Sequence, residues 1–144
     1  MADLIFDSAR AAIAGDTAIT SSPVDFEADT LHVLLLTSTY TPDATDVYVS
    51  DLTNEVANGN GYTTGGATLA NVAVTYSGST TTIDADDTQW TTSTITARYA
   101  VVCKWTGTDT TSPVLFLYDF GSDKSSSGGT FTVAWNASGL ATLT

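Results

Sequence analysis

The sequence predicts an all-β protein, an antiparallel β-sandwich of jelly-roll type with one short N-terminal helix. Short apolar segments that alternate with polar residues recur along most of the chain, as in strands. Turn residues separate these segments about every 8 to 12 residues, a spacing typical of sandwiches and barrels. Helical spacing occurs only near the N-terminus, so helices do not alternate with strands as in a parallel α/β fold. With 144 residues, the chain has the size of one domain.

The helix is expected between Asp3 and Gly15, where apolar residues recur at helical spacing. Asp3 is the expected N-cap, and Gly15 is the expected end. Residues 16–29 show no period and are expected to form an extended arm. The sequence is therefore divided into residues 1–29, a short helix and arm, and residues 30–144, a single β-sandwich domain.

Two segments are expected at the centre of the sandwich. Leu31–Leu36 is almost wholly apolar, as in a strand covered on both faces. Residues 95–105 show the cleanest alternation and predict a central strand with one buried face. The apolar excess on Leu31–Leu36 and on residues 114–120 is explained either by a second covered face or by an interface between copies of the chain. Other strands are expected at residues 69–76, 80–84, 114–120, 130–135 and 140–143, with a turn at residues 77–79 and a loop at residues 123–129. In the strand at 69–76, Val72, Val74 and Tyr76 are expected on one face.

Acidic residues dominate the charge of the chain. Sixteen Asp and Glu residues stand against four Lys and Arg residues, for a formal net charge of −12. Such a surface repels phosphate, so no nucleic acid and no membrane is expected as a partner. The apolar runs are far shorter than the roughly 20 residues of a membrane-spanning helix. The start of the chain shows no secretory signal, and the lone Cys103 indicates a reducing compartment of synthesis and a buried apolar residue.

Groups for catalysis are scarce in the sequence. His32 is the only histidine, and it lies in an apolar strand without a recognisable nucleophile motif, so a packed histidine is favoured. Asp84, Asp86 and Asp87 could offer oxygen ligands to calcium, but the spaced carboxylates of an EF-hand do not follow them. A solvated acidic turn is the favoured interpretation. The sequence predicts no enzyme, no cofactor and no metal site.

The aromatic residues could form either a sugar-stacking face or part of the core. Core packing is favoured, because most of them fall on inward positions of the expected strands. In a carbohydrate-binding module, Tyr62 and Trp90 would be the stacking residues. The glycine-rich loop around Tyr62 is an expected location for binding. The candidate surface or partner contacts are Phe6, Arg10, Tyr40, Tyr48 and Tyr62.

A series of short motifs runs along nearly the whole chain. It begins with LIFDSAR at residues 4–10 and DTLHVLL at 29–35. It continues with GY at 61–62, GG at 65–66, the tryptophan at 90, ARYAVV at 97–102, TSPVL at 111–115 and GGTFTVAW at 128–135. This order resembles a group of small structural proteins of tailed bacteriophages, some of which are head decoration or cement proteins with a jelly-roll-like sandwich.

The resemblance implies a virion protein on the exterior of the capsid, made in the cytoplasm of the bacterial host. Its expected partner is the major capsid protein, whose subunits it would bridge and stabilise, and it is expected to form homo-oligomers. The acidic surface fits the outside of a shell that holds DNA. A tail or tail-fibre component and a carbohydrate-binding sandwich that holds a host-surface glycan are the alternatives.

Overall fold

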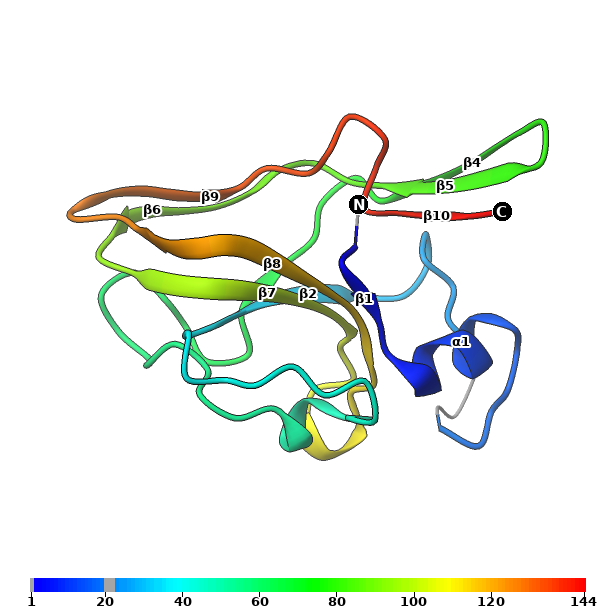
Figure 1. Ribbon diagram of the computed structural model, residues 1–144, viewed down its shortest axis with the longest axis horizontal. Coiled ribbons are helices and arrows are strands. Elements are labelled where there is room, and N and C mark those ends of the chain that lie inside the picture. The colour runs from blue at the N-terminus through cyan, green and yellow to red at the C-terminus, as the bar shows by residue number, and fades with distance from the viewer. Residues whose placement is uncertain (1, 20–22) are drawn as a thin grey trace.

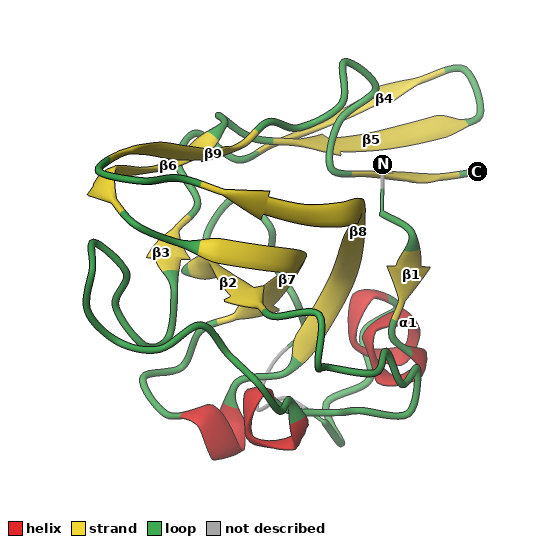
Figure 2. Ribbon diagram, turned by 60° about the vertical axis from the view of Figure 1, so that its left-hand side comes forward, coloured by secondary structure: helices red, strands yellow, loops and turns green. Residues whose placement is uncertain are grey.

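Antiparallel strands in two layers form the framework of the computed structural model, which describes residues 2–19 and 23–144 (Figures 1 and 2). One α-helix lies near the N-terminus, so the predicted all-β sandwich with a short helix is confirmed. Within the described residues, no helix is long and apolar enough to span a membrane.

The first layer is a five-stranded sheet with the strand order β1-β8-β7-β2-β3. Its long central strands are β2 (Leu31–Leu36), β7 (Thr96–Lys104) and β8 (Val114–Ser125). Two short strands, β1 (Leu4–Ile5) and β3 (Ala67–Thr68), complete its edges. The alternating segment 95–105 thus forms the central strand β7, but both of its faces are buried from Ala100 onward.

The second layer consists of two small sheets. One has the order β10-β5-β4, with β4 at Ala73–Ser77, β5 at Thr80–Asp84 and β10 at Ala141–Leu143. The other pairs β6 (Thr88–Ser93) with β9 (Gly129–Val133). Figures 1 and 2 show the β6–β9 pair above the central strands and the β10-β5-β4 sheet reaching past them on the side of α1.

The N-terminal segment is part of the sandwich. β1 pairs with β8, and the Asp3 backbone N–H donates to the Leu117 carbonyl at 2.9 Å, so the helix α1 (Asp7–Ile13) begins four residues after its predicted N-cap. Gly15, with φ of 103°, follows the end of the helix as predicted. In the expected arm, residues 20–22 lie outside the described residues, and Phe26 is buried in a stack on Phe116.

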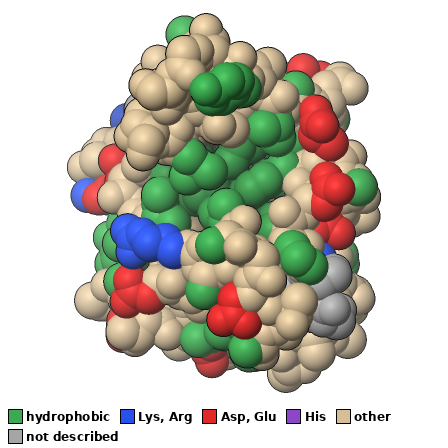
Figure 3. Space-filling view, turned by 90° about the vertical axis from the view of Figure 1, so that its right-hand side faces the viewer, with side chains coloured by type: hydrophobic (Ala, Val, Ile, Leu, Met, Phe, Trp, Pro, Cys, Tyr) green, Lys and Arg blue, Asp and Glu red, His purple; other side chains and the backbone are tan. Residues whose placement is uncertain are grey.

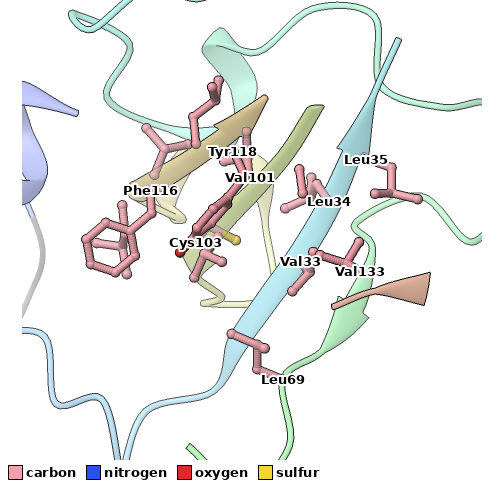
Figure 4. Close-up of a cluster of buried hydrophobic side chains, with 14 of the residues drawn as sticks. Val33, Leu34, Leu35, Leu69, Val101, Cys103, Phe116, Tyr118 and Val133 are labelled. Carbon is pink, nitrogen blue, oxygen red and sulfur yellow. The ribbon is translucent and has the colours of Figure 1, made fainter. Parts of the chain in front are cut away.

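Apolar side chains from both layers fill the space between the sheets (Figure 4). Val33, Leu34, Leu35 and Leu36 of β2 are fully buried, as are the first residues of β8. The second covered face of β2 and of the first part of β8 therefore lies within this chain. Two 3₁₀-helices, η1 (Val49–Asp51) and η2 (Asp109–Thr111), lie in the connections.

Three boundaries differ from the prediction. The strand expected at 69–76 starts only at Ala73, because Leu69 and Asn71 lie in the irregular connection after β3. The loop expected at 123–129 begins as strand, since β8 continues to Ser125 in register with Thr96 of β7. The strand expected at 130–135 starts at Gly129 and ends at Val133.

Candidate binding surface

Three of the five predicted contact residues are buried. Phe6, Tyr40 and Tyr62 expose 0%, 4% and 2% of their surface, so the prediction that they are surface contacts is wrong. Phe6 joins the core between β1 and α1. The Tyr40 ring meets the edge of Tyr99, and its hydroxyl donates to Asp46 at 2.7 Å. The Tyr40 ring thus adds apolar area to the core while its hydroxyl keeps a polar partner, which is the usual arrangement for a buried tyrosine.

Tyr62 anchors its glycine-rich loop from inside the protein. Its hydroxyl accepts from the Leu35 N–H at 3.1 Å and donates to the Glu55 carboxylate at 2.7 Å. The Gly65 N–H donates to the same carboxylate at 2.8 Å. Burial raises the pKa of both Glu55 and Tyr62. Trp90, with its ring centre 5.9 Å from that of Tyr62, is also buried, so neither ring can stack on a sugar.

The other two predicted contacts are accessible. Arg10 is exposed and pairs with Asp7 within α1 at 3.1 Å. Tyr48 is half-buried, and its hydroxyl donates to the Ile19 carbonyl at 3.0 Å. These two residues lie on different elements, and no contact joins them among the described residues.

His32 is packed rather than poised for catalysis. Its ring is stacked on Trp105, with the ring centres 4.7 Å apart. Its Nδ1 lies 2.8 Å from the Gly65 carbonyl oxygen, and its Nε2 lies 3.2 Å from the Thr68 hydroxyl oxygen. Burial lowers its pKa. The strand register places Cys103 opposite His32, a pairing that the sequence did not reveal. Burial raises the pKa of the Cys103 thiol to about 12, so this thiol stays protonated and is not an activated nucleophile.

The acidic turn before β6 is held by hydrogen bonds within the chain. Asp86 accepts from the Asn71 side chain at 2.6 Å, and Asp87 accepts from the Trp135 backbone N–H at 2.9 Å. The Trp135 indole N–H donates to the Asp86 carbonyl at 2.9 Å. Across residues 2–19 and 23–144, no three His, Cys, Asp or Glu side chains are grouped so that they could hold a metal ion.

The β10-β5-β4 sheet has one apolar and one polar face. Val74, Ile83 and Ala141 are directly opposite one another across the three strands, and so are Tyr76, Thr81 and Leu143. Residues two apart in a strand share a face, so both rows lie on one side of the sheet. Ile83 and Ala141 are buried, which identifies this side as the one that faces the core. The opposite side carries Ala73, Thr75, Ser77, Thr80, Thr82, Asp84 and Thr142.

The apolar face of the β10-β5-β4 sheet is buried at Ile83 and Ala141 but continues beyond the core into an exposed part. Val74 is 37% exposed and Tyr76 is 76% exposed, the two largest values among the large hydrophobic side chains of the described residues. Gly78, with φ of 65°, makes the tight turn that carries the β4–β5 hairpin outward. Figure 3 faces this side and shows apolar side chains gathered in a hollow beneath the hairpin, with carboxylates along one border and Lys or Arg side chains at the opposite one. We call the exposed side chains of Val74 and Tyr76, together with the half-buried side chain of Leu143, the overhang.

A second hollow, of about 230 Å³, lies where β8 and β9 diverge. Aromatic and polar groups line it, including Trp135, Phe120, Asp3, Asp119 and Asn136. Trp135 is half-buried and packs against Tyr118, with the ring centres 5.0 Å apart. The carboxylate of Asp119 is held in place by Arg98.

Comparison with known proteins gives no further guide to function. No protein-family description, no characterised protein and no solved structure matches the chain.

Proposed function

We propose that the protein is a structural protein of a bacteriophage virion, a capsid decoration protein that binds the outer shell and bridges major capsid subunits. The overhang is the observation that carries this proposal, because it is an apolar surface that a monomer in water leaves uncovered. The motif order along the chain, which resembles small structural proteins of tailed phages, supplies the virion context.

Charge supports the exterior of the capsid as its location. With a net charge of −12, the protein would repel packaged DNA and would not be held at the inner surface of a shell. On the outside, many copies would each add a small interface between neighbouring subunits. Because all copies act on one particle, weak contacts add up to a large stabilisation of the shell. The proposal includes contacts between neighbouring copies, arranged by the symmetry of the shell.

Quantitative mass spectrometry of purified virions tests the proposal. A decoration protein is expected at a simple ratio to the major capsid protein, on the order of hundreds of copies per particle. Purified protein is also expected to re-bind shells from which it has been stripped and to raise their melting temperature. A handful of copies would favour the alternative of a tail or tail-fibre component. Absence from the virion, or no binding to stripped shells, would contradict the proposal.

A carbohydrate-binding role is the second candidate, and the hollow at Trp135 favours it. An indole face beside carboxylate and amide groups is a common arrangement for stacking on a sugar ring and bonding to its hydroxyls. In this alternative, Trp135 replaces Tyr62 and Trp90 as the stacking residue. Binding on a glycan array that is lost in Trp135→Ala and retained in Tyr76→Ser would support it. A blank array would remove it.

A further inference from the structure

The overhang is a built surface rather than a chance exposure of single side chains. Isolated apolar residues are common on protein surfaces. Here, however, Val74, Tyr76 and Leu143 come from the two outer strands of one sheet and lie on the same face, while the opposite face presents mainly hydroxyl groups. A hairpin that only extended into water would have no reason to separate apolar from polar side chains in this way. The pattern is that of a sheet with a covered face, yet in the part of the chain that the structure describes Tyr76 remains 76% exposed.

The size of the overhang limits what can cover it. Neighbouring strands lie about 4.8 Å apart, so the row from β4 to β10 is about 10 Å wide. Residues two apart in a strand are separated by about 7 Å. A surface of this size accommodates two or three apolar side chains of a short segment. It is too small for the large interfaces of obligate dimers.

The charges beside the overhang favour a cationic partner. A Glu27 carboxylate oxygen accepts from the Val74 N–H at 3.2 Å, which places a negative charge directly at the edge of β4. Asp25, two residues earlier, is also exposed, and among the described residues no Lys or Arg pairs with either side chain. Three of the four cations of the chain are already paired, Arg10 with Asp7, Arg98 with Asp119 and Lys104 with Asp29. A symmetric dimer through the overhang would place the same carboxylates of both copies close together, which is unfavourable.

We infer that the overhang docks a short segment of a partner protein in which two or three apolar side chains are followed or preceded by Lys or Arg. The apolar side chains pack on Tyr76, Val74 and Leu143, and the cations approach Glu27 and Asp25. The inference rests on the proposed function only for the identity of the partner as a capsid subunit. The chemistry of the docked segment follows from the sheet and its charges.

A displayed library of random 12-residue peptides, selected on the immobilised full-length protein, is the first probe. The expected result is a set of peptides that combine apolar residues with Lys or Arg. One such peptide is then synthesised, and its Kd is measured by fluorescence anisotropy. A higher NaCl concentration is expected to weaken binding, because it screens exposed charges.

Matched variants locate the binding site. Tyr76→Ser is expected to weaken binding at least about tenfold, as for an aromatic residue at the centre of an interface. Thr75→Ala, on the opposite face of the same strand, is expected to leave Kd within about twofold, since residues outside an interface contribute little. Glu27→Gln keeps an acceptor for the Val74 N–H and removes the charge, so it is expected to weaken binding and to reduce its dependence on salt. Because all three residues are exposed, the variants are expected to melt like the parent protein.

Several results would overturn the inference. These are a library that yields no binder, binders without Lys or Arg, and binding that Tyr76→Ser does not change. A dimer in sedimentation that Tyr76→Ser dissociates would assign the overhang to a second copy instead. The proposed function is tested separately by the copy number in virions. Peptide binding without virion incorporation would retain the docking site and refute the decoration role.

Discussion

The Tyr62 hydroxyl donates to the Glu55 carboxylate at 2.7 Å inside the protein, and the same hydroxyl accepts from the Leu35 N–H. One oxygen thus links the central strand β2 to the connection before β3. Tyr62→Phe would keep the ring in place, remove the acceptor of the Leu35 N–H and leave the Glu55 carboxylate with the Gly65 N–H alone. Leaving buried polar groups unpaired costs about 1–3 kcal/mol each, so the free energy of unfolding is expected to fall by at least about 1 kcal/mol.

Urea denaturation of the parent protein and of Tyr62→Phe measures the difference in unfolding free energy, with Tyr76→Phe as the control. Tyr76 is 76% exposed, so removal of its hydroxyl is expected to change stability by less than about 0.5 kcal/mol. Equal losses in the two variants would show that the Tyr62 hydroxyl has no special role.

Glu55 also makes stability depend on pH. Burial raises the pKa of its carboxyl above the ordinary value of 4.5, so the folded protein binds this proton more tightly than the unfolded chain. Its contribution is therefore full below the ordinary pKa and is lost as pH rises through the raised pKa. Glu55→Gln keeps an oxygen to accept from Tyr62 and Gly65 but cannot ionise. The stability of the variant relative to the parent is expected to increase as pH rises from about 4 to 7.

The difference in unfolding free energy between Glu55→Gln and the parent protein is measured at several pH values. This difference reports the titration of Glu55 alone, because the other acidic groups are common to both proteins. A difference that stays constant from acid to neutral pH would mean that Glu55 titrates alike in the folded and unfolded states. A difference that changes in the opposite direction would mean that hydrogen bonding outweighs burial.

The central strands could be predicted from the sequence because their own residues determine their state. Leu31–Leu36 and the alternating run from 95 to 105 carry enough apolar side chains to identify them as buried strands. β1 could not be predicted in this way. It has only two residues, and it is a strand because β8 pairs with it. For the same reason the helix begins after Phe6 rather than at Asp3.

The binding surface was harder to predict, because exposure depends on which elements lie above a residue. Tyr62 lies among glycines, which suggested an exposed loop, but its partner Glu55 comes from a different part of the same connection and holds it inside. For Val74 and Tyr76, the alternation correctly predicted a shared face. The sequence could not show that the sheet below ends before it reaches them.

Gly66 marks a close contact between backbones at the edge of the first sheet. A Cβ atom at this position would lie 1.9 Å from the Val33 carbonyl oxygen, and the residue has φ of +74°. Gly66→Ala would push β2 away from the strand that follows, where Val33 pairs with Ala67. A loss of more than about 3 kcal/mol in unfolding free energy is expected, a size typical of severe backbone conflicts.

Gly128→Ala is the matched control for Gly66→Ala in thermal and urea denaturation. Gly128 also has a positive φ, +64°, but no atom lies within 4 Å of the added Cβ. Only the conformational cost is expected there, about 1–2 kcal/mol. Similar losses in both variants would show that the contact with Val33 relaxes at little cost.

Cys103 is expected to be unreactive in the folded protein, even though the register places it opposite His32. It is fully buried, and burial raises its pKa to about 12, so the thiolate that attacks disulfide reagents is scarce at pH 8. Labelling with Ellman's reagent is expected to be at least about a hundredfold slower in buffer than in guanidinium chloride, since only unfolded molecules expose the thiol. If His32 activated this thiol, the folded protein would react quickly and His32→Ala would slow the reaction. The expected result for His32→Ala is instead unchanged or faster labelling. Loss of the stack between His32 and Trp105 removes packing beside Cys103 and can only make its thiol more accessible.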